Sequence, residues 1–304
     1  MTPPVTIEQL NKDFGSEQVK VVEGKGGFPV VEVSNAKANA KISIYSAQVL
    51  SFQPAGEPTD VMFVSEKAYY QTGKATKGGI PICWPWFGPD PEGKGRASHG
   101  FVRNRMWTLL GAEATPSGET KVRLGMSPSE ETLAIWPCQF ELVMEATIGD
   151  QLTVTLTTKN TGDEAFSITQ AFHTYFSTGD ISKVKVLGLE GAQYLDKANG
   201  GDEKTQDGAI DITAEVDRVY RDVQPELIVE DGDLGRRIKI TSTGSKTAIV
   251  WNPWAEISAK MADLEDADYQ RFICVETANA GGDVVQVAAG ADYQLKAVYT
   301  IERS

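Results

Sequence analysis

The sequence is poor in the residues that build metal, redox and disulfide sites. Its 304 residues include two histidines and three cysteines, and they contain neither a C-x-x-C nor an H-E-x-x-H pattern. A dedicated metal site is therefore not expected. Cys83, Cys138 and Cys274 are odd in number and lie far apart in apolar stretches. We expect them to be free, buried thiols in a reducing compartment.

Signatures of nucleotide enzymes and serine hydrolases are also missing. The segment Thr243–Thr247 resembles a phosphate loop, but it lacks the upstream glycine spacing and a following helix pattern. No G-x-S-x-G sequence is present, which excludes a serine hydrolase of that type. Acid–base chemistry that needs no cofactor is the kind of activity that these absences leave.

Positive charge is scarce as well. The net charge of −13 argues against a nucleic-acid surface and against docking on anionic membranes. No apolar run approaches the length of a membrane span, and Met1–Lys12 lacks the charged leader and apolar run of a secretory signal. We expect a cytoplasmic protein, a monomer, whose partner is a small molecule.

The chain is rich instead in short strand patterns separated by turn signals. Gln139–Ile148 and Gln151–Lys159 are examples, and the Gly-Asp pair between them fits a tight hairpin turn. Helix signals are few: Thr6–Gln9 has the spacing of a capping box, and Ser127–Glu130 reads as an N-cap at Ser127 followed by proline. The pattern predicts one all-β domain over residues 1–304, a large antiparallel β-sandwich with a few short helices.

The stretch Phe166–Phe176 reads as one strand with two different faces. One face is mostly apolar and includes Phe172, whereas the other is small or hydrogen-bonding and includes His173. The second face has the composition expected for the floor of a cleft. His173 is either a half-buried structural histidine or a chemical group, and the polar residues on its face favour the second reading.

A carboxylate, Glu276, follows the apolar segment Arg271–Val275. It is either an exposed charge at the end of a strand or a partly desolvated group. In the second case its pKa would move toward neutrality, which suits a general base.

Basic residues gather in a long segment that is rich in glycine, proline and tryptophan. Between residues 67 and 105 there are two acids and seven basic residues: Lys67, Lys74, Lys77, Lys94, Arg96, Arg103 and Arg105. Such a basic island beside His99 in an acidic chain predicts a site for a small anion. Lys77 and Arg103 are the main candidates, because they adjoin glycines and aromatics where an unpartnered charge is costly. We expect the other lysines of the segment to be solvated.

Five motifs occur in a fixed order along the chain. They are G-G-I-P-I-C-W-P-W-F-G-P (Gly78–Pro89), S-H-G-F-V-R-N (Ser98–Asn104), F-H-T-Y-F (Phe172–Phe176), D-R-V-Y (Asp217–Tyr220) and C-V-E-T-A (Cys274–Ala278). From about residue 40 to the C-terminus, the chain resembles the glucose-6-phosphate 1-epimerases, or hexose-6-phosphate mutarotases, of the aldose 1-epimerase superfamily. The resemblance implies a galactose-mutarotase-like sandwich and an isomerase without a cofactor.

The resemblance also implies roles for individual residues. His173 resembles the family's general acid and Glu276 its general base, and we expect the two to face each other across a gap the size of a sugar. The implied substrate contacts are Lys77, Ser98, Arg103 and Asp217, with His99 as a further sugar contact. The family commonly has arginine at the position of Lys77, and a lysine holds a phosphate as a point charge. The implied reaction interconverts the α and β anomers of an aldohexose 6-phosphate, with glucose 6-phosphate as the expected substrate.

Other functions stay open on the sequence alone. The same fold could carry a mutarotase for unphosphorylated aldoses, or a non-catalytic carbohydrate-binding or regulatory protein. A glycoside hydrolase would need two carboxylates, for which Glu276 and Asp217 could serve. A polysaccharide lyase shares the sandwich, but no tyrosine–arginine pair stands out. Trp84, Trp86 and Phe87 could stack on a sugar or fill the core.

Overall fold

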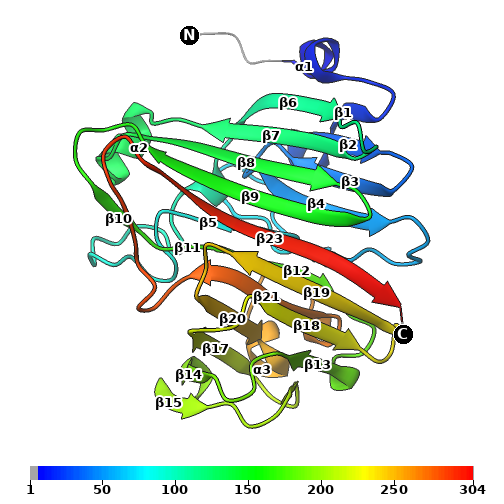
Figure 1. Cartoon of the computed structure of the whole chain (residues 1–304), viewed down its shortest axis with the longest axis vertical. Coiled ribbons are helices and arrows are strands. Elements are labelled where there is room, and N and C mark those ends of the chain that lie inside the picture. The colour runs from blue at the N-terminus through cyan, green and yellow to red at the C-terminus, as the bar shows by residue number, and fades with distance from the viewer. Residues whose placement is uncertain (1–5, 304) are drawn as a thin grey trace.

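Two layers of antiparallel sheet dominate the computed structural model, which describes residues 6–303 (Figure 1). The first layer is a nine-stranded sheet. In spatial order its strands are β16 (Ile210–Asp211), β13 (Val184–Leu187), β18 (Glu226–Asp231), β19 (Arg236–Thr243), β23 (Asp292–Arg303), β9 (Gln151–Asn160), β8 (Phe140–Ile148), β7 (Thr120–Met126) and β6 (Thr108–Ala114). The start of the segment in which no secretory signal is expected, Met1–Val5, lies outside the described residues.

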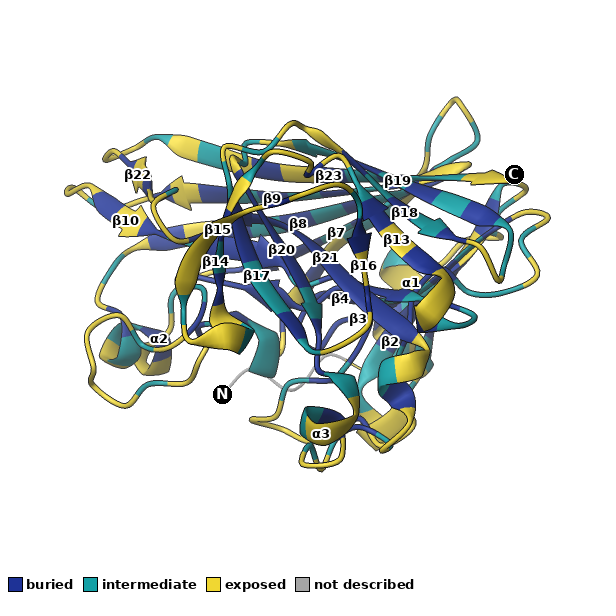
Figure 2. Cartoon of the chain, turned by 90° about the horizontal axis from the view of Figure 1, so that it is seen from below, coloured by how far each residue is buried: buried dark blue, intermediate teal, exposed yellow. Residues whose placement is uncertain are grey.

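The second layer is built mainly from an eight-stranded and a four-stranded sheet (Figure 2). The eight strands are β15 (Asp202–Thr205), β14 (Gln193–Asp196), β17 (Val216–Arg221), β20 (Thr247–Asn252), β21 (Phe272–Asn279), β11 (Gln170–Phe172), β5 (Ile82–Cys83) and β12 (Tyr175–Ser177), which pairs with β21. The four are β1 (Val19–Glu23), β2 (Pro29–Ser34), β3 (Ala38–Ser43) and β4 (Gln48–Pro54). β10 (Phe166–Ile168) and β22 (Val285–Val287) form a separate pair. The predicted large antiparallel β-sandwich is confirmed.

Alternating side chains build the core between the layers. Burial alternates along β8 and β9, and the Gly-Asp turn joins them in the predicted hairpin, with Met144 opposite Leu156. Residues such as these pack in one continuous cluster with Phe52 of β4 and Val250 of β20. Burying one such side chain contributes roughly 1.5–3 kcal/mol relative to exposing it. Because this largest cluster joins strands from both layers, we infer the single domain that the sequence predicts.

Helices are short. α1 (Ile7–Phe14) begins where the sequence predicts, since the Thr6 side chain accepts a hydrogen bond from the backbone of Gln9. The second helix was predicted two residues too early. α2 (Glu130–Ile135) has Ser129 as its N-cap, and Thr132 rather than Glu130 completes the capping box. α3 (Trp254–Ser258) has no side-chain cap, so the sequence carries no signal for it. No helix within residues 6–303 has the length and apolar character needed to cross a membrane.

The stretch Phe166–Phe176 is not one strand, contrary to the prediction. It divides into β10, β11 and β12, with breaks at Thr169 and at His173 and Thr174. At the breaks the backbone N–H of Thr169 donates to Pro85 and that of His173 to Pro81 (3.0 and 2.9 Å), so loop carbonyls replace a neighbouring strand. The prediction of two different faces is still confirmed, because Phe172 lies in the core and His173 lines a pocket on the opposite side of the sheet.

The long segment before β6 is ordered by its aromatics. Trp84 is fully buried, packs edge-on against Trp136 and donates from Nε1 to Thr158 Oγ1 (3.0 Å). Trp86 is also in the core, so neither tryptophan can stack on a sugar, whereas Phe87 lines the pocket.

The three cysteines are free. Cys83 and Cys274 are buried as predicted, but Cys138 is half-buried, so the expectation of a buried thiol is wrong for that residue.

Candidate active site

A polar pocket of about 290 Å³ lies on the face of the eight-stranded sheet that is turned away from the main core. All seven residues selected from the sequence line it: Lys77, Ser98, His99, Arg103, His173, Asp217 and Glu276. They come from five separate stretches of chain, which the sheet and the long loop bring together.

Three neighbouring strands form the floor of the pocket. Asp217 of β17 lies opposite Trp251 of β20, and Ile249 of β20 lies opposite Glu276 of β21. Glu276 is not a strand-end charge, contrary to the first reading of the sequence: it lies within β21, all eight residues of which are buried. Its exposed fraction is 2%, so the desolvated alternative is the correct one.

His173 and Glu276 lie side by side on this floor. His173 Nδ1 is 3.4 Å from Glu276 Oε1, so the two groups share a face but are not separated by the sugar-sized gap that the sequence predicts. The His173 ring stacks on Tyr175 with centroids 4.9 Å apart, and its edge meets Trp251. These aromatic contacts fix the orientation of the imidazole.

Two atoms of this pair have no hydrogen-bond partner. His173 Nδ1 and Glu276 Oε2 are buried and unbonded among the residues that the structure describes. Buried polar atoms in proteins are nearly always hydrogen-bonded. His173 Nδ1, which lies next to Glu276 Oε1, and Glu276 Oε2 are therefore polar atoms whose hydrogen-bonding capacity the described residues leave unused.

Burial shifts the pKa values of both groups toward their neutral forms. It lowers the pKa of His173 well below 6.5, and the nearby His99, Arg103 and Lys77 add to the effect. It raises the pKa of Glu276 well above 4.5, with a further contribution from Asp217. Opposite shifts on adjacent groups are a hallmark of acid–base sites.

His99 is held over the pocket by a strained loop. Its φ is +64°, its backbone N–H donates to the Gly88 carbonyl (2.7 Å), and its Nδ1 accepts from the Gly88 N–H (3.2 Å). Because Nδ1 is an acceptor, the neutral ring carries its proton on Nε2. The next residue must be glycine, since a Cβ on Gly100 would lie 1.8 Å from the Trp84 carbonyl oxygen.

The basic segment separates into paired and unpaired cations. Four of its members pair outside the pocket: Lys67 with Glu265, Lys94 with Glu92, Arg96 with Asp90 and Arg105 with Glu131. Within the pocket, Lys77 Nζ lies 3.5 Å from Asp263 Oδ2. Arg103 donates only to the Ser98 carbonyl oxygen (3.1 Å), and no described carboxylate forms an ion pair with it.

Lys197 is a cation of the pocket that the sequence did not predict. It lies on η4 (Lys197–Asn199), directly after β14, and lines the pocket near Asp217. Burial raises the pKa of Asp217, and the charge of Lys197 opposes that rise. A single lysine in a polar turn gives no pattern from which the sequence could identify it.

The fold places the chain among the galactose-mutarotase-like sandwiches. A crystal structure described as a galactose mutarotase-like protein from Clostridium acetobutylicum superimposes with a TM-score of 0.74 over 94% of this chain and 98% of its own, at 13% identity. The chain belongs to the aldose 1-epimerase family: the family model described as "Aldose 1-epimerase" matches residues 29–300. It is an isomerase of that type.

Proteins that are at least 30% identical to this chain carry names of the same type. A protein of Escherichia coli named "Putative glucose-6-phosphate 1-epimerase" is 36% identical over 252 residues, which are 83% of each chain. A protein of Cenchrus ciliaris with the same name is 37% identical and covers 85% of this chain and 80% of its own. A crystal structure described as "a putative mutarotase (YeaD)" from Salmonella typhimurium has a TM-score of 0.88 and 30% identity, and the match covers 95% of both chains.

Proposed function

We propose that this isomerase interconverts the α and β anomers of an aldohexose 6-phosphate, with glucose 6-phosphate as the preferred substrate. The observation that carries the proposal is the buried pair of His173 and Glu276, which lines one pocket with Arg103 and Lys197, two cations that form no ion pair among the described residues. The names of the Escherichia coli and Cenchrus ciliaris relatives support the choice of glucose 6-phosphate.

In the proposed mechanism, Glu276 is the general base and His173 the general acid. Glu276 removes the proton of the anomeric hydroxyl while His173 donates a proton to the ring oxygen. The C1–O5 bond opens to the free aldehyde, and rotation about C1–C2 presents its other face. Ring closure then returns both protons. Each positioned proton transfer contributes roughly 10²–10⁴-fold.

The pair can reach its active state without an outside proton. The reaction begins with Glu276 ionised and His173 protonated, whereas burial favours the neutral form of each. Passing one proton from Glu276 to His173 across the 3.4 Å contact produces the required ions. A phosphate dianion bound by the cations of the pocket favours the imidazolium, because it offsets the positive charges that lower the pKa of His173.

Among the cations, Arg103 and Lys197 are the free anion ligands. Arg103 offers a planar fork of donors that suits a phosphate, and Lys197 adds a point charge from η4. Ser98, His99 and Asp217 are left to bind sugar hydroxyls, since they line the same pocket and carry donors and acceptors.

Anomer exchange measured by NMR magnetisation transfer tests the proposal. The wild-type protein should accelerate exchange of glucose 6-phosphate well above the buffer rate, and more than it accelerates glucose or galactose 6-phosphate. His173→Asn should stay folded, bind glucose 6-phosphate and exchange its anomers at the buffer rate. Near wild-type exchange in that variant would remove His173 from the mechanism.

Equal acceleration of glucose and glucose 6-phosphate by the wild type would instead identify a mutarotase for unphosphorylated aldoses.

A further inference from the structure

Asp263 lies beside Lys77, a residue that lines the pocket, on a firmly held turn between α3 and η5 (Asp268–Gln270). The neighbouring Leu264 is 1% exposed and packs in a cluster with Tyr175 and Phe272. The turn is closed by Asp268, whose Oδ2 accepts from the backbone N–H of Glu265 (2.9 Å). Asp263 therefore cannot move far from the pocket without disturbing buried contacts.

The lysine opposite Asp263 is held just as firmly. The carbonyl oxygen of Lys77 accepts from the Ser65 N–H (3.1 Å). Gly78 follows with a φ of +121°, and a Cβ there would lie 2.4 Å from the Phe63 carbonyl oxygen. The backbone from the Lys77 carbonyl group to Gly78 is thus packed against the Phe63–Ser65 segment.

The two side chains form a partly buried ion pair at the pocket. Lys77 Nζ and Asp263 Oδ2 are 3.5 Å apart, and the side chains are 16% and 19% exposed. Burial lowers the pKa of Lys77, and Asp263 acts against that change. Of the three cations that line the pocket, Lys77 is thus the one whose charge is already balanced by a described carboxylate.

We propose that Asp263 determines how strongly the pocket prefers phosphorylated over unphosphorylated sugars, because it competes with the substrate phosphate for Lys77. The proposal rests on the proposed function, in which a sugar phosphate occupies this pocket. A phosphate dianion that contacts Lys77 also meets the negative charge of Asp263, and in a partly buried site that repulsion is only weakly screened. A neutral sugar meets no such repulsion. Asp263 is a specificity-determining residue, not a catalytic one.

Removing the carboxylate should therefore improve anion binding. By isothermal titration calorimetry, we expect Asp263→Asn to bind inorganic phosphate and glucose 6-phosphate about threefold to tenfold more tightly than the wild type, as expected for a partly screened charge pair. Binding of glucose should not change. A merely structural role for Asp263 predicts the opposite, since a displaced Lys77 would weaken anion binding.

Three further variants isolate the cause. Asp266→Asn makes the same change of charge on an exposed residue of the same turn, and it should leave phosphate affinity at the wild-type value. In a Lys77→Met background, Asp263→Asn should no longer tighten phosphate binding. Asp263→Ser, which removes the carboxylate without leaving an amide, should reproduce the gain, with folding checked by thermal unfolding.

The proposal is overturned if phosphate affinity falls or stays unchanged in both Asp263 variants while they remain folded. It is also overturned if the gain persists without Lys77, or if Asp266→Asn produces the same gain. Because inorganic phosphate binding requires no turnover, these results are separate from the proposed function. A wild-type protein that binds phosphate but exchanges no anomers would refute the function and leave the role of Asp263 standing.

Discussion

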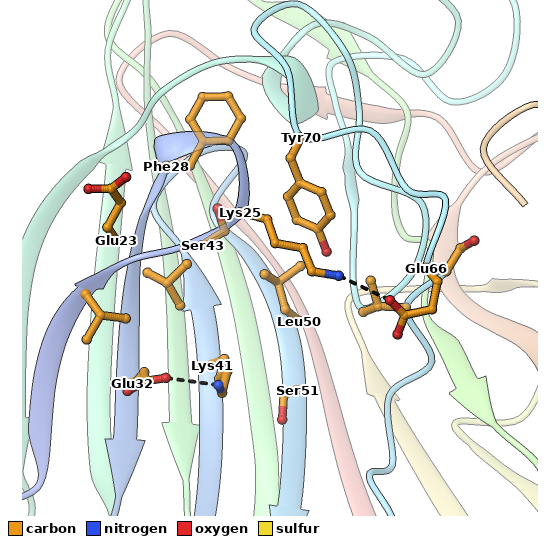
Figure 3. A pocket seen from close by; sticks show the side chains of 15 residues that line it. Glu23, Lys25, Phe28, Glu32, Lys41, Ser43, Leu50, Ser51, Glu66 and Tyr70 are labelled. Carbon is orange, nitrogen blue, oxygen red and sulfur yellow. Dashed lines mark hydrogen bonds and ion pairs between the residues drawn. The ribbon is translucent and has the colours of Figure 1, made fainter.

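Two hollows of similar size differ in the burial and the pairing of their charged side chains. The hollow over the four-stranded sheet, lined by residues such as Lys25, Phe28, Lys41 and Tyr70, has a volume of about 340 Å³, against about 290 Å³ for the pocket of His173. Two ion pairs lie in it near the surface, Lys25 with Glu66 (3.3 Å) and Lys41 with Glu32 (2.9 Å), as Figure 3 shows. Of these two, the hollow over the four-stranded sheet is the larger.

The pocket on the eight-stranded sheet instead keeps a carboxylate buried, with one of its oxygens unbonded among the described residues. Glu276 has a side-chain exposure of 1%, compared with 38% for Glu32. Leaving a buried carboxylate without hydrogen bonds costs free energy that a paired surface carboxylate does not. Proteins retain such costly groups mainly where function requires them. The protonation chemistry of a cavity, rather than its size, therefore distinguishes the site.

The largest difference between the hollows should appear in activity. We expect Glu276→Gln to slow anomer exchange by at least about 10²-fold, because a neutral amide cannot accept the proton of the anomeric hydroxyl. Glu32→Gln, the same change in the other hollow, should keep wild-type exchange. NMR magnetisation transfer with glucose 6-phosphate measures both. A loss of exchange in Glu32→Gln alone would reverse the assignment of the two hollows.

The next largest difference between the two hollows should appear in the recognition of the substrate phosphate. We expect Arg103→Ala to lower kcat/KM for glucose 6-phosphate about 10- to 100-fold more than for glucose, as loss of a charge-assisted hydrogen bond to phosphate predicts. Lys41→Ala removes a cation from the other hollow and should change neither value. Equal losses on the two sugars in Arg103→Ala would show that Arg103 holds the ring and not the phosphate.

Part of the structure could be predicted from residue patterns because those patterns reflect local physics. Strands with one buried face, such as β8 and β9, show their alternation in the sequence. β15 has four exposed residues and no alternation, so no pattern indicates it. The polar end of β21 gives no sign of burial in the sequence, but Asn279 is buried there and donates to the Gly244 carbonyl oxygen and to Asp283. Only the folded chain supplies those partners.

The same limit applies to the candidate site. His173 and Glu276 stand in motifs, and both lie in the predicted pocket. Their 3.4 Å separation depends on the break in the strand after Phe172 and on the pairing of β11 and β12 with β21. Those contacts join segments about a hundred residues apart. The fold likewise brings Lys197 into the pocket and Asp263 next to Lys77. Both residues lie in turns whose sequence shows no motif that would have identified them.

Stability should respond in the opposite direction to activity. The raised pKa of Glu276 means that its stabilising contribution is complete below about pH 4.5, the value in the unfolded chain, and is lost as pH rises through the folded value. At pH 8, Glu276→Gln should therefore raise the free energy of unfolding by about 1–3 kcal/mol. At pH 4 the gain should vanish, because the wild-type carboxyl is then protonated in both states. Urea denaturation at the two pH values measures the difference, and an equal effect at both would mean that Glu276 is ionised at no cost.

The smallest effect should come from the ion pair that closes the other hollow. Lys25 and Glu66 have side chains that are 60% and 78% exposed, although they lie 3.3 Å apart. Exposed pairs gain little, because water and salt screen the charges and both side chains lose freedom. Lys25→Met should change the free energy of unfolding by less than about 0.5 kcal/mol, and anomer exchange should not change. Urea denaturation and the NMR assay together check this. A loss of more than about 1 kcal/mol, or any loss of exchange, would mean that the charges of this hollow do more than pair with each other, and the contrast between the two hollows would fail.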